Sequence, residues 1–256
     1  MRNGAGQPEV AGTPGRPAAD ATRRIANATR HDANAAHQVA AVILAAGAST
    51  RMGRNKLLLE LNGETVVRRA ARTAIAAGLD PVIVVTGHAR EVVEGELHGL
   101  RCRSVFNSEH AHGTHTSVAA GIGAVEPIAC AAAIVMLADM PLVTSPMLQA
   151  LVDRYRESGA PLVASRYGGD INAPPILYDR RLFGELREMD ARCGRQIVRR
   201  HRQEAVEMVW PSEAGRDLDR PEDYEWIREM LARRARATTV PMPVTPTPSS
   251  ASGTDG

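Results

Sequence analysis

The chain has 256 residues, of which 44% are hydrophobic and 23% charged, a composition typical of one globular domain or at most two small ones, which excludes a wholly disordered chain. The net charge is +2 at pH 7, and residues 39–235 carry equal numbers of acidic and basic side chains, which argues against binding to duplex nucleic acid. Three widely spaced cysteines without a C-x-x-C motif argue against disulfides and a thiolate zinc site, which favours a reducing compartment. No apolar run reaches the roughly 20 residues that cross a bilayer. We therefore expect a cytoplasmic protein without membrane contact.

The two ends of the chain differ in composition from its centre. Residues 1–38 lack hydrophobic periodicity and are interrupted by prolines, and residues 236–256 place further prolines among Thr and Ser. Such segments bury too little apolar surface to offset the entropy lost on ordering. We therefore expect disordered tails at 1–38 and 236–256 around a single domain at 39–235.

Within that domain, short runs rich in Val and Ile alternate with longer stretches of helical spacing. In chain order, we expect a strand at 39–44, a helix at 65–77, a strand at 81–86, a helix at 89–97, a strand at 103–106, a helix at 116–125, a strand at 131–137, a helix at 145–158, a strand at 161–165, and helices at 194–201 and 221–235. Thr65 and either Thr144 or Ser145 are expected to cap helices, Gly78 to end one and Pro221 to begin one. The alternation predicts an α/β domain with a largely parallel sheet, which binds ligands at the carboxyl ends of its strands.

The first candidate site is the segment 44–56, directly after the first predicted strand. Gly47 and Gly53 let the backbone approach a bulky anion, and Arg51 and Lys56 bring positive charge to phosphates. The spacing fits neither the phosphate-binding loop G-x-x-x-x-G-K-[ST] nor the dinucleotide pattern G-x-G-x-x-G. Composition alone leaves open a flexible connection with an incidental Arg and Lys.

Residues 44–57 resemble the signature L-A-A-G-x-S-x-R-M-G-x-x-K-L of molybdenum cofactor cytidylyltransferases and match it at every fixed position. The resemblance extends to the helix after Pro221 and implies a three-layer, Rossmann-like nucleotidyltransferase fold of the glycosyltransferase-A-like type. It implies catalytic roles for Arg51 and Lys56. The nucleotide contacts that it implies in this segment are Leu44, Ala45, Ala46, Gly47, Ser49, Arg51, Gly53 and Lys56. Related guanylyltransferases read L-A-G-G at the start of the signature, so Ala46 favours cytosine by analogy.

Two acidic positions are candidate ligands for Mg²⁺. Asp139 ends the most hydrophobic predicted strand, where a carboxylate can hold a divalent cation against phosphates, and the resemblance gives it that catalytic role. Asp217 and Asp219 precede the last predicted helix, where capping is the more ordinary function of such residues. The family pattern assigns one of this pair as a second metal ligand; we favour Asp219 and keep Asp217 in reserve. For Asp139, capping of the following turn is the alternative.

The segment 107–121 holds three closely spaced histidines, yet a loop that enters a helix seldom fixes three imidazoles on one metal. The segment resembles the family element N-x-x-x-x-x-G-x-x-x-S-[LV]-x-x-G, which implies nucleotide or acceptor contacts by Asn107, Gly113 and Ser117. On this analogy the histidines form a polar wall or face solvent.

The acceptor side is expected at residues 167–178, where the match to the family is looser. Asp170, Asn172 and Pro174 are the candidate contacts, with turn formation an equal alternative for the two polar residues. Cationic residues at 192–201 belong either to a solvated helix face or to a clamp for an acceptor phosphate.

Together these features predict a Mg²⁺-dependent nucleotidyltransferase that transfers CMP from CTP to molybdopterin and releases pyrophosphate. A molybdenum hydroxylase or its chaperone would then receive the product. A sugar or polyol phosphate is the alternative acceptor. From other classes, the alternatives are a dinucleotide-dependent oxidoreductase, which lacks its glycine pattern here, and a non-catalytic module that binds a nucleotide or a cofactor.

Overall fold

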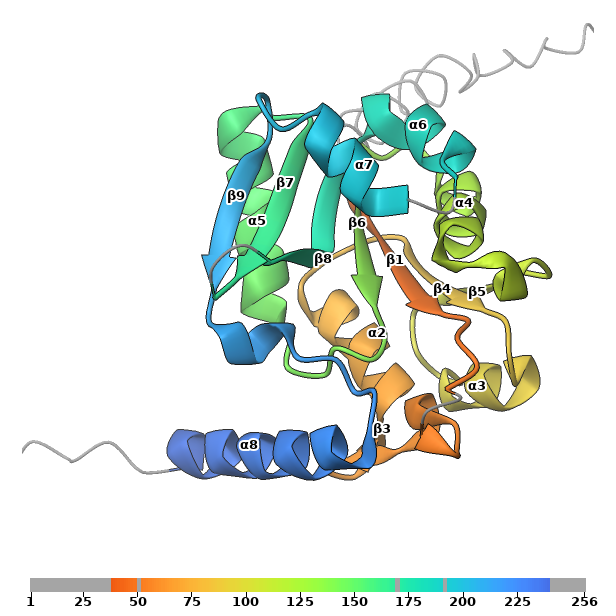
Figure 1. Ribbon diagram of the computed structural model, residues 1–256, viewed down its shortest axis with the longest axis vertical. Coiled ribbons are helices and arrows are strands. Elements are labelled where there is room, and N and C mark those ends of the chain that lie inside the picture. The colour runs from red at the N-terminus through yellow and green to blue at the C-terminus, as the bar shows by residue number, and fades with distance from the viewer. Residues whose placement is uncertain (1–37, 50–51, 169–170, 191–192, 240–256) are drawn as a thin grey trace, which may run out of the picture.

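One seven-stranded sheet organises the chain, with the strand order β5-β4-β1-β6-β8-β7-β9 (Figure 1). This computed structural model describes residues 38–49, 52–168, 171–190 and 193–239. The strands are β1 Val39–Ala45, β4 Val82–Thr86, β5 Arg103–Phe106, β6 Ala132–Leu137, β7 Leu162–Tyr167, β8 Ile171–Asp179 and β9 Val206–Trp210, and a separate hairpin pairs β2 Glu60–Leu61 with β3 Glu64–Thr65. Within the large sheet β8 runs antiparallel to β6 and β7, whereas the other pairs are parallel. The predicted α/β fold with a mostly parallel sheet is confirmed.

Helices cover both faces of the sheet. They are α2 Val66–Ala76, α3 Arg90–Glu96, α4 Thr114–Val125, α5 Ser145–Ser158, α6 Phe183–Glu188, α7 Cys193–Arg200 and α8 Pro221–Thr239. Buried side chains of α2, α3, α5 and α8 form one hydrophobic cluster, and those of α4, α6 and α7 form a second cluster on the opposite face. Figure 1 shows α7 in front of the sheet and α5 behind it, so the domain has three layers.

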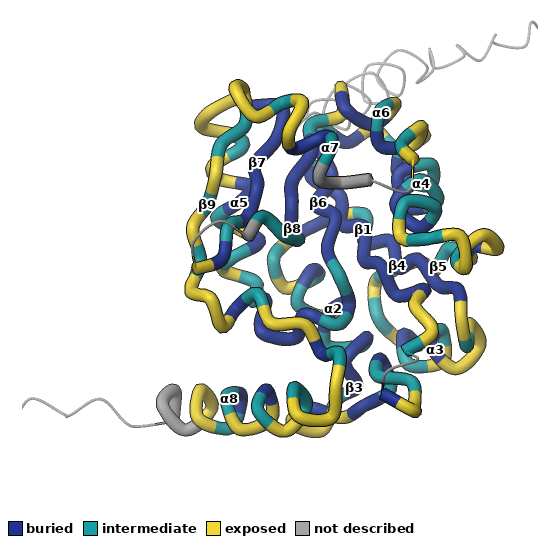
Figure 2. The backbone as a smooth tube through the Cα atoms, in the orientation of Figure 1, coloured by how far each residue is buried: buried dark blue, intermediate teal, exposed yellow. Residues whose placement is uncertain are grey.

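The central strand β1 explains the apolar run at the start of the domain. Ala41 and Ile43 belong to the first cluster, while Ala40 and Val42 belong to the second. Because alternate residues of a strand face opposite sides of the sheet, a strand covered on both faces needs an uninterrupted apolar sequence. The central strands are accordingly buried along their length, whereas α8 is largely exposed (Figure 2).

Helix α4 approaches the sheet closely at Gly121. A Cβ atom added there would lie 2.2 Å from Cγ1 of Val42 and 3.0 Å from Cγ2 of Val85. These distances are shorter than a carbon–carbon contact allows, so glycine at this position sets how near the helix lies to β1 and β4. The second half of α4 thereby packs directly against β1 and β4.

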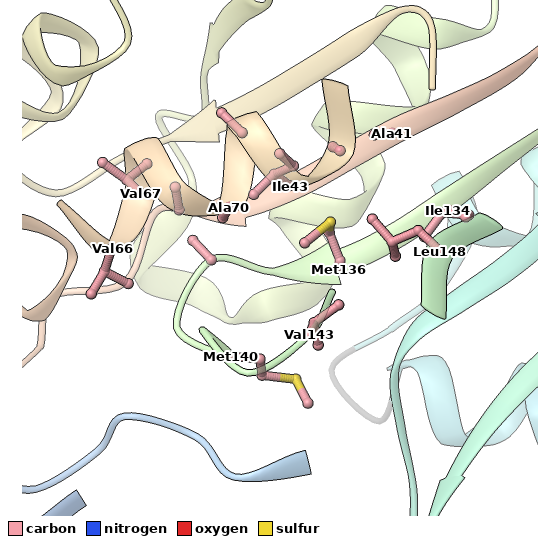
Figure 3. Packing of buried hydrophobic residues seen from close by; sticks show 14 of the residues in the cluster. Ala41, Ile43, Val66, Val67, Ala70, Ile134, Met136, Met140, Val143 and Leu148 are labelled. Atoms are coloured by element: carbon pink, nitrogen blue, oxygen red, sulfur yellow. The ribbon is translucent and has the colours of Figure 1, made fainter. Parts of the chain in front are cut away.

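The loop after β6 is anchored by its own hydrophobic side chains. Met140 and Val143 are buried and belong, together with Val66 and Met136, to the first cluster (Figure 3). Arg69 of α2 adds a hydrogen bond of 3.0 Å from its Nε to the carbonyl oxygen of Pro141. Asp139, two residues after the end of β6, is therefore carried by a fixed turn.

Most predicted elements are found within a few residues of their expected ends, including Pro221 as the first residue of α8 and Gly78, with φ of 76°, after α2. The expected caps are wrong at Thr65 and Thr144, whose side chains make no capping hydrogen bond. The hydroxyl of Thr65 instead donates to Glu96 over 3.0 Å. Helix α8 continues past residue 235 to Thr239.

The predicted tails, apart from Gln38 and residues 236–239, lie outside the described residues. In the part of the chain that is described, no helix is long and apolar enough to cross a membrane.

Candidate active site

A cavity of about 410 Å³ opens at the carboxyl ends of β1 and β6. This volume is within the range of about 300–1,000 Å³ that is usual for small-molecule sites. The lining residues come from the segment after β1, the start of α4, the end of β6 and the segment before α8: Leu44, Ala45, Ala46, Gly47, Ala48, Ser49, Lys56, Leu57, His110, Thr114, Ser117, Leu137, Asp139, Asp217 and Asp219.

The loop after β1 is folded back so that Lys56 faces this cavity. The backbone N–H of Lys56 donates to Oγ of Ser49 over 3.2 Å, and Ser49 itself has a positive φ of 53°. Asn55 accepts a hydrogen bond from the N–H of Leu57, whose side chain is buried. Ser49 and Lys56 are therefore tied together, and Gly47, which precedes Ser49, is exposed and lines the cavity.

Lys56 joins two acidic segments that are far apart in the sequence. Its Nζ atom lies 2.5 Å from Oδ2 of Asp139 and 2.7 Å from Oδ1 of Asp219. Burial opposes the charged form of the ammonium, but the two carboxylates outweigh it and raise the pKa of Lys56. Lys56 is thus a fixed cation shared by both carboxylates.

The segment that carries Asp217 and Asp219 is held by groups other than their side chains. Leu218 is fully buried between them. Asp223, in the first turn of α8, accepts hydrogen bonds from the N–H groups of Arg220 and Asp219 over 2.9 and 3.3 Å. Capping at this helix start is therefore performed by Asp223, which leaves Asp217 and Asp219 on the cavity wall.

The three carboxylates repel one another. Partial burial and the carboxylates of Asp139 and Asp219 raise the pKa of Asp217 to about 6, although the residue, which lines the cavity, is also exposed to solvent. A concentration of negative charge that already shifts the titration of one member favours an additional cation.

The residues present fit a divalent cation such as Mg²⁺. Oxygen atoms of Asp139 and Asp219 converge on one positively charged atom, and carboxylate oxygens are the ligands that hard divalent cations prefer. Among the described residues, no group of three or more His, Cys, Asp or Glu side chains is arranged to hold a metal. A cation held by these two aspartates would need water and phosphate oxygens to complete its coordination, which is the usual arrangement for Mg²⁺.

The opposite wall of the cavity comes from the start of α4 and the turn before it. Asn107 is buried, and its Nδ2 donates to Oγ1 of Thr116 over 2.8 Å and to Oγ of Ser117 over 3.0 Å. Asn107 therefore positions Ser117, which lines the cavity, without lining it itself. Of the three histidines, His110 faces the cavity, whereas His112 is exposed and lies 2.7 Å from Oε2 of Glu109.

The structure brings together most of the residues singled out from the sequence. Those that line the cavity are Leu44, Ala45, Ala46, Gly47, Ser49, Lys56, Ser117, Asp139 and Asp219. Those that are described but do not line it are Gly53, Asn107, Gly113, Asn172 and Pro174. Arg51 and Asp170 lie outside the described residues. Lining residues absent from the predicted contacts are Ala48, Leu57, His110, Thr114 and Leu137, and Asp217, kept in reserve as a ligand, joins them.

Of the predicted acceptor residues, Asn172 and Pro174 lie on β8, beside β6. Asn172 is paired in register with Arg166 of β7, and its Oδ1 is buried without a hydrogen-bond partner in the described part of the chain. The carbonyl oxygen of Pro174 accepts a hydrogen bond of 3.0 Å from the hydroxyl of Tyr167. Within the cationic stretch 192–201, Arg200 lies 2.6 Å from Glu185 of α6, so this arginine connects two helices.

Comparison with known proteins identifies relatives along most of the chain. Residues 41–206 match the sequence profile of the MobA-like NTP transferase domain. The purine catabolism protein PucB of Bacillus subtilis is 30% identical over 201 residues, which span 75% of this chain and 96% of that protein. The bifunctional protein GlmU of Geotalea uraniireducens is 32% identical over 126 residues, or 48% of this chain and 27% of GlmU.

Solved structures show the same fold over a similar length. Rv0371c from Mycobacterium tuberculosis is 27% identical, with a TM-score of 0.63 over 75% of this chain and 98% of that one. A nucleotidyl transferase from Methanothermobacter, Mth528, is 25% identical, with a TM-score of 0.65 over 77% of this chain and 99% of that one. Rv0371c has also been solved as a complex with manganese, and that structure is 26% identical to this chain, with a TM-score of 0.60 over 75% of this chain and 98% of that one.

Proposed function

The chain belongs to the MobA-like NTP transferase family, and on that premise we propose that it transfers CMP from CTP to the terminal phosphate of molybdopterin, releases pyrophosphate and requires Mg²⁺. The class of the enzyme, a nucleotidyltransferase, follows from the family. The donor base, the acceptor and the metal are the proposed part. We also propose that residues 39–235 form the catalytic domain and that a molybdenum hydroxylase or its chaperone receives the product.

One observation carries the proposal. At the end of a loop that can receive phosphates, the ammonium group of Lys56 lies between the carboxylates of Asp139 and Asp219. Such a site can hold a divalent cation on its carboxylates and direct the lysine to an entering triphosphate. Neither a serine nor a cysteine nucleophile paired with a base is needed for this chemistry.

The reaction follows from the charges of its participants. A terminal phosphate of the acceptor is already ionised at neutral pH, so it can attack the α-phosphate in line without a general base. The bond to pyrophosphate breaks as the new diphosphate bond forms, and negative charge builds on the leaving oxygens. Lys56 is positioned to stabilise that charge, and Mg²⁺ bound to Asp139 and Asp219 would supply further positive charge.

Specificity for cytosine and for molybdopterin is supported by resemblance in the segment 44–57. Ala46, the position at which cytidylyltransferases and guanylyltransferases of this family differ, lines the cavity. Asn172, with its buried unpaired oxygen, remains our candidate contact for the acceptor together with Asp170 and Pro174. Arg51 is proposed as a second catalytic cation on the triphosphate.

The test is pyrophosphate release by the purified protein with Mg²⁺ and each of CTP, GTP, ATP and UTP, with and without molybdopterin. Release that requires both CTP and molybdopterin would support the proposed donor and acceptor. Release with another triphosphate would correct the base, and release with a sugar or polyol phosphate in place of molybdopterin would correct the acceptor. No release with any pair would favour a module that binds nucleotide without turnover.

A further inference from the structure

The cavity has two chemically different ends, separated by the end of β1. On the side of β6 it is lined by Lys56, Asp139 and Asp219. On the other side, β4 and β5 follow β1 in the sheet, and the residues after β5 contribute His110 to the wall, followed by Thr114 and Ser117 from α4. A triphosphate with its cation suits the charged end. The base of the same nucleotide then lies towards the uncharged end.

Gly87, directly after β4, brings two walls of the uncharged end together. A Cβ atom added to Gly87 would lie 2.7 Å from Cβ of His110, 2.8 Å from Cγ of His110 and 2.8 Å from Cβ of Ala46. The next residue, His88, donates its backbone N–H to the carbonyl oxygen of Ala46 over 3.2 Å. Ala46 and His110 therefore both pack against Gly87, and Ala46 is also hydrogen-bonded to the residue that follows it.

This contact fixes where the imidazole begins. The side chain of His110 occupies the space that a side chain at position 87 would need, so only glycine there leaves room for its Cβ and Cγ atoms. Neither of the two neighbouring histidines occupies an equivalent position. His112 is exposed and pairs with Glu109, and His115 is absent from the cavity wall.

From this geometry we infer that His110 is a specificity-determining residue for the donor nucleotide. Its ring, seated over Gly87 beside the methyl group of Ala46, closes the uncharged end of the cavity so that a single-ring base fits and a two-ring base is obstructed. This inference rests on the proposed function, since it requires a nucleoside triphosphate to occupy the cavity. His110 would then limit the size of the base from a second side of the cavity, in addition to Ala46.

The test compares His110→Ala with His112→Ala in the full-length protein. Affinities for CTP and GTP are measured by titration calorimetry with Mg²⁺ and without acceptor, so that the result does not depend on the identity of the acceptor. Removal of a side chain that shapes a pocket changes discrimination by about tenfold or more. We expect His110→Ala to shift the ratio of CTP to GTP affinity towards GTP by that factor, and His112→Ala to leave the ratio within about twofold of the original protein.

A second variant displaces the imidazole ring of His110 without replacing a residue that lines the cavity. Gly87→Ala would push the side chains of His110 and Ala46 away, so its affinity ratio should also change, in a protein that circular dichroism shows to be folded. An unchanged ratio in His110→Ala, with clear binding of CTP, would overturn this inference and leave the proposed function standing. Failure of the original protein to bind any triphosphate would overturn both.

Discussion

The backbone N–H of Leu218 donates a hydrogen bond of 2.9 Å to the carbonyl oxygen of Asp139. The side chain of Leu218 is fully buried, so the segment with Asp217 and Asp219 is attached to the turn after β6 through its main chain and its apolar side chain. The three carboxylates are not needed for that attachment. They can therefore be replaced singly in a folded protein.

Asp139→Ala should abolish metal-dependent turnover while the fold is retained. The variant removes one of two carboxylates beside Lys56, and loss of one well-placed electrostatic group typically costs about 100-fold or more in rate. Pyrophosphate release and a thermal melt measure the two effects separately. Leu218→Ala is the contrasting variant: burial predicts a loss of about 2–5 kcal/mol of stability for it. A collapse of the melting temperature in Asp139→Ala would show that Asp139 is structural.

Lys56→Met should have opposite effects on the two ligands. Replacement removes the ammonium group that pairs with both Asp139 and Asp219, so the nucleotide-free protein should bind Mn²⁺ more tightly. Triphosphate binding and the rate should both fall, because a phosphate partner is lost. Free Mn²⁺ measured by electron paramagnetic resonance gives the first result and calorimetry with CTP the second.

The control for that experiment is Arg54→Met, a nearby basic residue that is exposed and lies over the ring of Tyr224 at 5.8 Å. It should leave Mn²⁺ affinity unchanged. Equal Mn²⁺ affinity in Lys56→Met and the original protein would mean that the lysine and the cation do not share a position.

Asp217→Asn should raise stability at neutral pH. Partial burial and the neighbouring carboxylates raise the pKa of Asp217 from 3.8 to about 6 in the folded protein. The folded state thus holds this proton more tightly than the unfolded chain, so the associated stabilisation is complete below pH 3.8 and is lost as the pH rises through about 6. Without metal, the melting temperature of Asp217→Asn should therefore be higher than that of the original protein at pH 8. Below pH 4 the two melting temperatures should become equal. Curves that run parallel over this range would contradict the assignment.

Two glycines of α4 should respond oppositely to alanine. Gly121→Ala places a methyl group against Val42, and overpacking of this kind costs about 1–3 kcal/mol. Gly123 has open space, since an added Cβ would lie 3.8 Å from Nε of Arg187, so alanine there should gain about 0.5–1 kcal/mol from the helix interior. Urea denaturation of both variants measures the difference. Destabilisation of equal size in both would contradict the close approach at Gly121.

The strands that could be predicted from the sequence are those buried on both faces. The uninterrupted apolar runs of β1 and β6 have no other simple explanation in a domain of this size. Strand β8 is absent from the strands predicted by hydrophobic periodicity because Pro174 and Pro175 within it count against a strand interior. Strand β9 pairs along β7 alone and alternates between half-buried and exposed residues, so its apolar signal is weak.

The charged end of the cavity was accessible to sequence reasoning because Lys56, Asp139 and Asp219 each belong to a recognisable motif. His110 was not accessible in the same way. Its two neighbouring histidines have the same chemistry, and what distinguishes it is contact with Gly87 and Ala46, which depends on the packing of separate loops. The assignment of capping to Asp223 likewise required the hydrogen bonds to be seen.

The order of the acidic segments has a consequence for how the protein matures. Lys56 and Asp139 are translated well before Leu218, whose backbone joins the turn after β6. A nascent chain on the ribosome can therefore assemble the centre of the sheet while its cavity still lacks Asp217 and Asp219. Since long-range contacts form only after the intervening chain has been made, the third and fourth charged groups of the site arrive last. The site proposed for the divalent cation is thus complete only after residue 219 has been translated.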